Sequence, residues 1–299
     1  MQTHGIRRIL ICVDGSPMSE IGIPYAVCIA ETFGSALTLL YVQEARAERV
    51  GPHGAPHSTD ALGWEIARRE ATDYLERMGR RASELSGRYV ESRLEQGHPA
   101  ERIAALAREV GADLTVLGSH GEGGIAAWNL GSTVQQVLSL TRGSVLIARA
   151  RGPSPEVIRP ARILVPLDGS QRTESVLPIA ARIANTHGSE ILLTHVVEEP
   201  QPSGVLCEGE DLELAFELAR RLEARAARYL ERIRAQLASE GAPVRATVIR
   251  HKGPHQSLIE FAEREQVDLV IASAHGATCH VARSFGVVMA HLLAHSKIA

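Results

Sequence analysis

The sequence is poor in aromatic residues and in cysteine, and both shortages limit what the protein can be. Aromatic residues make up 4% of the 299 residues, whereas hydrophobic residues reach 44%, so the core has to be built from aliphatic side chains. The four cysteines lie far apart and form no C-x-x-C pair: Cys12, Cys28, Cys207 and Cys279. We therefore expect neither a disulfide framework nor a zinc site, and predict reduced, mostly buried thiols.

Long hydrophobic runs and a strong net charge are also lacking. The longest apolar runs, such as Val145 to Ala148, are far too short to span a bilayer, and no apolar signal region precedes the first strand-like run. The formal net charge is −3, which argues against nucleic acid as the main partner. We expect a cytoplasmic protein that binds neither a membrane nor nucleic acid.

The second half of the chain repeats the first. The segment RILICVDGS at residues 8–16 recurs as RILVPLDGS at residues 162–170, and GADLTVLGSHG at residues 111–121 corresponds to QVDLVIASAHG at residues 266–276. The two offsets are 154 and 155 residues, and this near-constant spacing indicates the duplication of one whole domain.

Within each half, short apolar strands alternate with helices, which is typical of a parallel sheet covered on both faces. We therefore predict two tandem, doubly wound α/β domains. The first half is expected to contain strands over residues 9–13, 36–42, 89–94, 114–117 and 145–148, and helices over residues 19–33, 65–85, 99–110 and 131–140.

A proline-bearing segment separates the two halves. Residues 151–160 contain three prolines and a glycine between two apolar runs, so we expect an interdomain linker there, with domains at residues 1–150 and 161–299. The strand that opens at residue 144 has no full counterpart, because residue 299 corresponds to its first position. We expect the second domain to lack its last strand, which leaves the edge of the fourth strand open unless another element or subunit covers it.

Ligands of open α/β sheets bind beyond the carboxyl ends of the strands, where the strand order reverses. The turn after the first strand is Asp14-Gly15-Ser16, which is neither G-x-G-x-x-G nor a P-loop. Asp14 either accepts hydrogen bonds from a ribose or a base amine, or initiates the next helix as a cap. Its recurrence as Asp168 leaves both readings open, because duplication copies a cap as well as a contact.

The turn after the fourth strand is rich in glycine. It begins at Gly118 and leads to Gly131-Ser132-Thr133, which opens a helix. Backbone N–H groups at such a loop and at a helix N-terminus favour an anion, so these residues predict a phosphate cradle. The alternative is a glycine-rich hairpin loop whose serine caps the helix.

The spacing Gly118-x2-Gly121-x9-Gly131-Ser132 resembles the G-2x-G-9x-G-[S/T] motif of ATP-binding universal stress protein domains. The resemblance covers essentially the whole chain, as two such domains in tandem. It implies Rossmann-like (HUP) domains with strand order 3-2-1-4-5, and it implies that ATP binds with Mg²⁺. It further implies that Asp14 and the backbone of Val42 hold the adenine and ribose. Six residues would line the ribose and phosphates: Gly118, His120, Gly121, Gly131, Ser132 and Thr133.

The second half departs from this motif. Ser273 replaces Gly118 and Val287 replaces Ser132, so a side chain stands at an approach glycine and the helix start loses a hydroxyl. Gly121 and Gly131 are kept as Gly276 and Gly286, and Asp168 and His275 are retained as well. We therefore expect the first half to bind ATP and the second to bind it weakly or not at all.

The sequence contains no convincing catalytic constellation or metal site. No Ser-His-Asp order is evident, His120 is interpreted as a phosphate contact or a loop hydrogen bond, and His53 and His57 lie in an aperiodic segment that we expect to be an exposed loop. We favour a nucleotide-binding stress or signalling protein without efficient turnover, with an unidentified protein partner and possible homodimers. The alternatives are a slow ATPase and a nucleotide-free interaction module.

Overall fold

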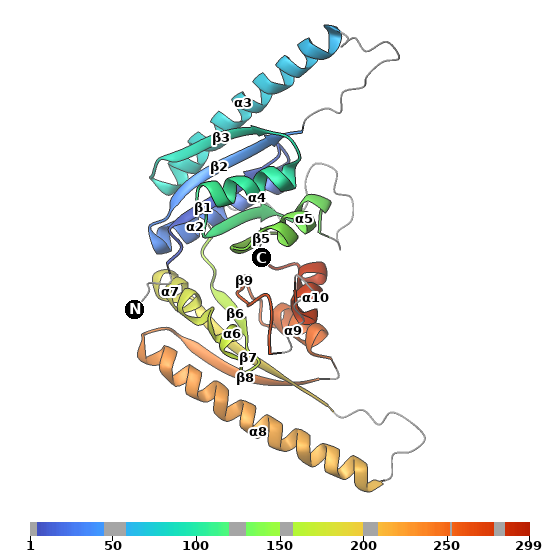
Figure 1. The fold of residues 1–299 in the computed structure, drawn as a ribbon. Coiled ribbons are helices and arrows are strands. Elements are labelled where there is room, and N and C mark those ends of the chain that lie inside the picture. Colours follow the sequence, from blue (N-terminus) through green and yellow to red (C-terminus); the bar gives the residue numbers. More distant parts are fainter. Residues whose placement is uncertain are drawn as a thin grey trace. The chain divides into compact units, whose positions relative to one another are not determined.

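The protein folds into two α/β units, each built on an open parallel sheet (Figure 1). The computed structural model describes residues 5–44, 58–119, 130–149, 158–199, 209–251, 253–277 and 285–299. One unit comprises Gly5–Ile158 and is called the first domain, and the other contains Arg159–Ala299 and is called the second domain. Most of the linker expected over residues 151–160 lies outside the described residues.

The first domain has five parallel strands in the order β3-β2-β1-β4-β5, which confirms the predicted doubly wound sheet. Because the strand order reverses between β1 and β4, helices α2 and α3 pack together on one face, and α4 and α5 on the other. The elements are β1 (Arg8–Val13), α1 (Pro17–Glu20), α2 (Gly22–Phe33), β2 (Ala36–Gln43), α3 (Ser58–Ser86), β3 (Val90–Gln96), α4 (Pro99–Glu109), β4 (Leu114–Gly118), α5 (Ser132–Leu140) and β5 (Ser144–Ala148).

The second domain repeats this order with four strands, β8-β7-β6-β9. On the side of β9 away from β6, the Val270 amide donates to the Ala299 carbonyl at 2.8 Å; no fifth strand lies there among the residues described, as the sequence predicted. The elements are β6 (Arg162–Pro166), α6 (Gln171–Glu174), α7 (Leu177–His187), β7 (Glu190–Glu198), α8 (Gly209–Ser239), β8 (Val244–His251), α9 (Pro254–Arg264), β9 (Leu269–Val270) and α10 (Val287–His295).

Aliphatic side chains fill the centre of both sheets. Ile9, Leu10 and Ile11 of β1 are at most 1% exposed, because this central strand is covered by helices on both faces. The same positions of β6, at residues 163–165, are fully buried as well. The largest fully buried side chain is the aromatic ring of Phe261 on α9, which packs against the sheet of the second domain.

The single helix predicted over residues 19–33 is wrong, because α1 and α2 share that part of the chain as two separate helices. Pro24 has no N–H to donate to the Glu20 carbonyl, and its ring would clash with that carbonyl in a continuous helix. Pro178 stands at the same place in the second domain, where α6 and α7 are likewise separate. The predicted end of α2 is confirmed, because Gly34 caps it in the left-handed conformation.

The two cysteines that the structure describes, Cys12 and Cys28, are buried thiols. Burial raises the pKa of Cys12 far above its ordinary value, so the group stays protonated and is a poor nucleophile. Both agree with the prediction of reduced, buried thiols, and Cys207 and Cys279 lie outside the described residues.

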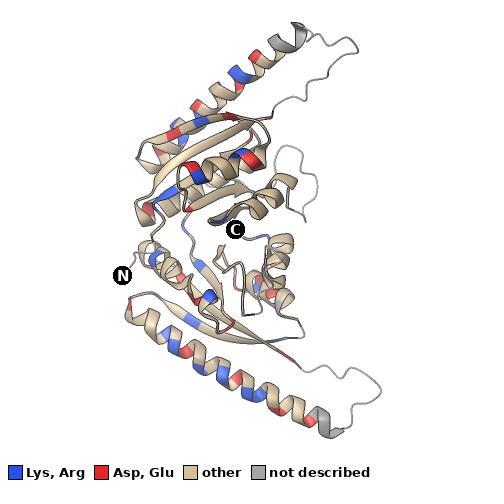
Figure 2. Ribbon diagram, in the orientation of Figure 1, with Lys and Arg blue, Asp and Glu red and all other residues tan. Residues whose placement is uncertain are grey.

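Charged side chains follow the two long helices α3 and α8 (Figure 2). On α8, Arg221 pairs with Glu217 at 2.8 Å and Arg234 with Glu231 at 2.6 Å, one helical turn apart in each case. Such exposed pairs keep one side of a helix in water. In the part of the chain that the structure describes, no helix combines the length and the apolar character that crossing a membrane requires.

Candidate functional site

The turn after β1 is organised around Asp14. Its Oδ1 accepts hydrogen bonds from the Ser16 amide at 3.0 Å and the Ser16 hydroxyl at 2.6 Å. Ser16 in turn caps α1, because its Oγ accepts from the Ser19 amide at 3.2 Å. Of the two readings that the sequence left open, capping therefore belongs to Ser16, while Asp14 holds the turn in shape through one carboxylate oxygen.

The second carboxylate oxygen of Asp14, Oδ2, has no hydrogen-bond partner among the described residues. The Asp14 side chain is half-buried. Gly15 has a φ of +90°, a conformation that favours glycine. Val42 lies half-buried near the carboxyl end of the adjacent strand β2. The crevice edge thus offers a hydrogen-bond acceptor beside a strand backbone.

Gly118 is required by the packing of the protein itself. A Cβ at this position would lie 2.6 Å from the Met18 carbonyl oxygen and 2.8 Å from the Ser19 Cα, so the carboxyl end of β4 can approach α1 this closely only as glycine. Sequence reasoning gave Gly118 a role in approaching a ligand and missed this contact. The motif spacing carries no signal for it, because α1 lies about a hundred residues earlier in the sequence.

A hydrogen bond closes the base of the glycine-rich loop. The Gly131 amide donates to the Ser119 carbonyl at 3.0 Å, and the Gly131 carbonyl accepts from the Gln135 amide at 3.0 Å. The donors that α5 offers to a ligand are therefore the N–H groups after Gly131, which have no acceptor within the helix. Ser132 is exposed and Thr133 half-buried at this end. His120 and Gly121 lie outside the described residues.

The second domain rebuilds the same framework. Oδ1 of Asp168 accepts from the Ser170 amide and from the Thr173 hydroxyl, both at 2.9 Å. The loop is closed in the same way, because the Gly286 amide donates to the Ala274 carbonyl at 2.9 Å. The duplication has therefore preserved the backbone of the site in both domains.

The other oxygen of Asp168 is bonded to the loop after β9, whereas Glu122, which corresponds to Ala277 in the first domain, lies outside the described residues. The Ala277 amide donates to Oδ2 of Asp168 at 2.6 Å, so the chain itself uses the oxygen for which Asp14 shows no partner among the described residues. Burial raises the pKa of Asp168, but the hydrogen bonds from Ser170, Ala277 and Thr173 outweigh it and hold this pKa below its ordinary value. The carboxylate is therefore ionised, and its negative charge disfavours an anion close by.

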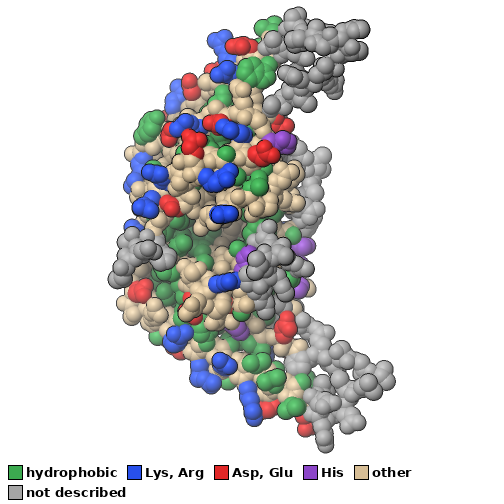
Figure 3. Space-filling model, in the orientation of Figure 1, with side chains coloured by type: hydrophobic (Ala, Val, Ile, Leu, Met, Phe, Trp, Pro, Cys, Tyr) green, Lys and Arg blue, Asp and Glu red, His purple; other side chains and the backbone are tan. Residues whose placement is uncertain are grey.

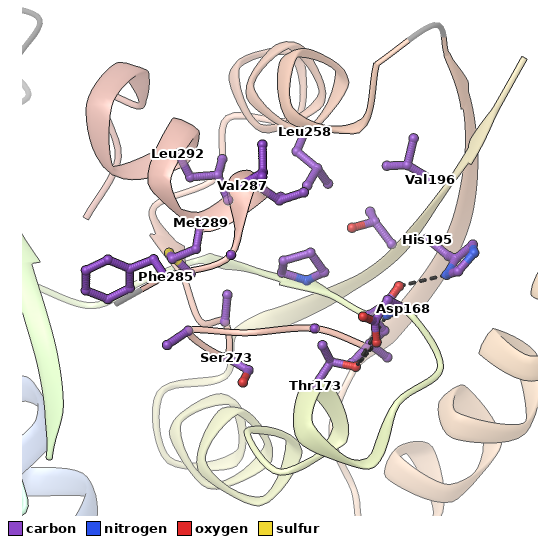
Figure 4. Close-up of a pocket in the computed structure, with 18 residues that line it drawn as sticks. Asp168, Thr173, His195, Val196, Leu258, Ser273, Phe285, Val287, Met289 and Leu292 are labelled. Carbon is purple, nitrogen blue, oxygen red and sulfur yellow. Dashed lines mark hydrogen bonds between the residues drawn. The ribbon is translucent and has the colours of Figure 1, made fainter. Parts of the chain in front are cut away.

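A cavity of about 290 Å³ lies at the switch point of the second domain. Figure 4 shows Leu258 of α9 and Val287 and Leu292 of α10 on one side, and Asp168 and His195 on the other. Mostly apolar residues line it: Leu167, Val196, Leu258, Ala272, Phe285, Val287, Val288, Met289 and Leu292, with Asp168, Thr173, Thr194, His195 and Ser273 among the polar ones.

A tyrosine on each long helix is hydrogen-bonded to the short helix that follows the first strand of its domain. The Tyr74 hydroxyl donates to Glu20 at 3.2 Å, and the Tyr229 hydroxyl donates to Glu174 at 3.0 Å. Burial and the neighbouring glutamate raise the pKa of both tyrosines, so each hydroxyl remains a donor. Sequence analysis missed both pairs, whose partners lie 54 and 55 residues apart.

Three histidines form a cluster in the second domain: His255 on α9, and His291 and His295 on α10. Figure 3 shows histidines at the surface of this domain. The ring centroids of His255 and His291 are 4.5 Å apart, and those of His291 and His295 are 4.1 Å apart. Burial, helped by His295 and His255, lowers the pKa of His291 below its ordinary value of 6.5. Within the described ranges no three His, Cys, Asp or Glu side chains are arranged to hold a metal ion.

Acidification is expected to destabilise the second domain through His291. In the unfolded chain the His291 imidazole takes up a proton near pH 6.5. In the folded chain it does so only at lower pH. The contribution of neutral His291 to the free energy of unfolding is therefore complete above pH 6.5. It is lost as the pH falls towards the lowered pKa of the folded state. Urea unfolding at about pH 7.5 and about pH 5.5 measures the loss, which His291→Gln should reduce. An unchanged pH dependence in His291→Gln, equal to that of the exposed control His98→Gln, would contradict the assignment.

The fold, with its repeated turns after the first and fourth strands of each sheet, defines a tandem pair of Rossmann-like α/β domains. The model of the universal stress protein family matches residues 5–149 and again residues 161–299. The chain therefore belongs to the universal stress protein family, as a member with two such domains in tandem.

Individual relatives match one domain or the whole fold. Universal stress protein YxiE of Bacillus subtilis is 32% identical over 147 residues, which are 48% of this chain and 98% of that protein. Universal stress protein MJ0531 of Methanocaldococcus jannaschii is 28% identical over 145 residues, 48% of this chain and 82% of that protein. A crystal structure of a universal stress protein from Archaeoglobus fulgidus covers 97% of this chain and 96% of its own, with a TM-score of 0.66 at 16% identity, a likeness in fold alone.

Proposed function

We propose that the first domain binds ATP together with Mg²⁺, and that the protein is a nucleotide-dependent stress or signalling protein without efficient turnover. The observation that carries the proposal is the pairing of Asp14, whose Oδ2 has no partner among the described residues, with the open N-terminus of α5. They belong to the turns after the neighbouring strands β1 and β4, where ligands of doubly wound sheets bind.

Each predicted residue keeps a defined role in this proposal. Asp14 and the backbone of Val42 hold the adenine and ribose, and the N–H groups at the start of α5 meet the phosphates. The hydroxyls of Ser132 and Thr133 add donors to the same oxygens. The residues that shape the loop and line the ribose and phosphates are Gly118, His120, Gly121 and Gly131. Mg²⁺ supplies charge neutralisation and is held mainly by the phosphates and its own waters.

Binding without turnover fits the residues of the crevice. The Ser16 hydroxyl donates to Asp14 and the Ser19 hydroxyl to the Ser16 carbonyl, so both hydroxyls are held within the turn after β1. A slow ATPase remains the alternative enzyme function, and a nucleotide-free interaction module the alternative without a ligand. The proposal includes a cytoplasmic location, a homodimer and a partner protein that senses the nucleotide-bound state.

Isothermal titration of the full chain with ATP and Mg²⁺ tests the proposal. The wild type is expected to bind one ATP tightly. Ser132→Val, which introduces the residue found at the corresponding place of the second domain, should weaken binding about tenfold or more, because a hydrogen bond to a charged phosphate is lost.

Ser139→Val is the matched control, because Ser139 is exposed on the same helix and donates only to the Gln136 carbonyl. Its affinity for ATP should equal that of the wild type. No detectable binding by the wild type would overturn the proposal in favour of the nucleotide-free module. Sustained multiple turnovers would favour the slow ATPase.

A further inference from the structure

The cavity of the second domain has the size and lining of a small-molecule site. Its volume of about 290 Å³ is roughly twice that of the engineered apolar cavity of about 150 Å³ that binds benzene. It therefore suits a molecule of about two fused rings. Leu258 and Leu292 form part of its wall, so an apolar ligand that enters the cavity removes its own apolar surface from water, which is favourable.

The polar side chains that could receive phosphates are occupied or missing in this cavity. Asp168 is ionised, and both of its oxygens already accept hydrogen bonds from the chain. The Ser273 hydroxyl donates to the His275 carbonyl at 3.0 Å. Val287 places an aliphatic side chain at the start of α10, where the first domain has Ser132. This lining disfavours a charged polyphosphate.

One polar atom of the lining is left without a partner. Thr194 of β7 is fully buried, and its Oγ1 makes no hydrogen bond among the described residues. The other threonine of the lining is satisfied, since Thr173 Oγ1 donates to Asp168 Oδ1 at 2.9 Å and accepts from the Asp168 amide at 3.3 Å. A buried hydroxyl without a partner costs free energy, and a ligand that hydrogen-bonds to it removes that cost. The first domain has Leu40 at the corresponding place.

We propose that the second domain is a binding site for an uncharged, largely apolar molecule of about two fused rings, carrying one group that hydrogen-bonds to Thr194. The site is separate from the nucleotide site proposed for the first domain. The two domains therefore bind ligands of different chemistry, although they share one backbone framework.

Methyl NMR of the full chain distinguishes the two sites, because Met289 lines the cavity and Met18 lies in α1, next to the Asp14 turn. Indole serves as the uncharged probe, and ATP with Mg²⁺ as the charged one. Indole is expected to shift the Met289 methyl signal in a saturable manner and to leave Met18 unchanged. ATP should shift Met18 and leave Met289 unchanged.

The variant Thr194→Val tests the role of the unpartnered hydroxyl. Wild-type protein is expected to bind indole about three- to tenfold more tightly than 1-methylindole, which lacks the N–H donor. Thr194→Val should abolish that preference while still binding 1-methylindole. Thr186→Val is the control, because Thr186 lies on α7 outside the cavity and donates to the Arg182 carbonyl; it should keep the wild-type preference.

A second variant, Ala272→Phe, fills the cavity and should abolish the indole response of Met289. The proposal is overturned if neither indole nor 1-methylindole shifts Met289 up to its solubility limit, or if ATP shifts Met289 instead. It is also overturned if the preference for indole survives Thr194→Val. Failure of the nucleotide proposal would be seen separately, as a Met18 signal that does not respond to ATP.

Discussion

Replacing Phe261 by alanine is expected to lower the free energy of unfolding of the second domain by about 3–5 kcal/mol. Phe261 is 2% exposed and packs in a cluster with Leu164 and Leu192 of the sheet and with Ile298. Leu164 and Leu192 are held in the paired strands β6 and β7, so they cannot move inward to fill the space that the ring leaves. Urea unfolding followed through the Met289 methyl signal reports on this domain alone.

Phe216→Ala is the matched control for this measurement. Phe216 is 51% exposed on α8 of the same domain, and its loss should change the free energy of unfolding by no more than about 0.5 kcal/mol. A loss below about 1 kcal/mol in Phe261→Ala would show that the site relaxes around the missing ring. The cluster would then not be the rigid centre of the domain that its burial indicates.

Gly118→Ala is expected to lower the free energy of unfolding of the first domain by about 1–3 kcal/mol. The added Cβ would lie 2.6 Å from the Met18 carbonyl oxygen and 2.8 Å from the Ser19 Cα. Both contacts are with backbone, so no side-chain rotation relieves them, and either β4 or α1 has to shift. Urea unfolding followed through the Met18 methyl signal, without nucleotide, measures the loss.

Gly63→Ala is the control, and it is expected to change the free energy of unfolding in the opposite direction. Gly63 lies in α3, and a Cβ there meets nothing within 4 Å, so alanine should raise the free energy of unfolding by about 0.5–1 kcal/mol. If Gly118→Ala keeps wild-type stability but loses ATP binding, Gly118 serves the approach of a ligand and not the packing against α1.

Sequence analysis predicted the fold because its signals are local and repeated. Apolar strands alternating with helices define a parallel sheet, and the offset of about 154 residues doubles the evidence. The break between α1 and α2 was missed, although Pro24 and Pro178 both carry the signal. The apolar periodicity of the segment continues through the break, and this favoured one helix over two.

The candidate site was predictable only in part, because its decisive contacts join distant residues. The Asp14 turn is local, and its aspartate, glycine and serine were read directly. The bond from Ala277 to Asp168 spans 109 residues, and the contact between Gly118 and α1 spans about as many. Residue types at a motif position do not reveal which neighbour approaches them in space. The cavity of the second domain follows from several such contacts together.

The hydrogen bond that closes the base of the glycine-rich loop has an evolutionary consequence. Gly131 bonds to Ser119 in one copy, and Gly286 bonds to Ala274 in the other. Because both bonds join backbone atoms, substitutions of the surrounding side chains leave the anchor in place. Side chains near this anchor could therefore change after the duplication without loss of the fold, as Ser273 and Val287 have done at the places of Gly118 and Ser132.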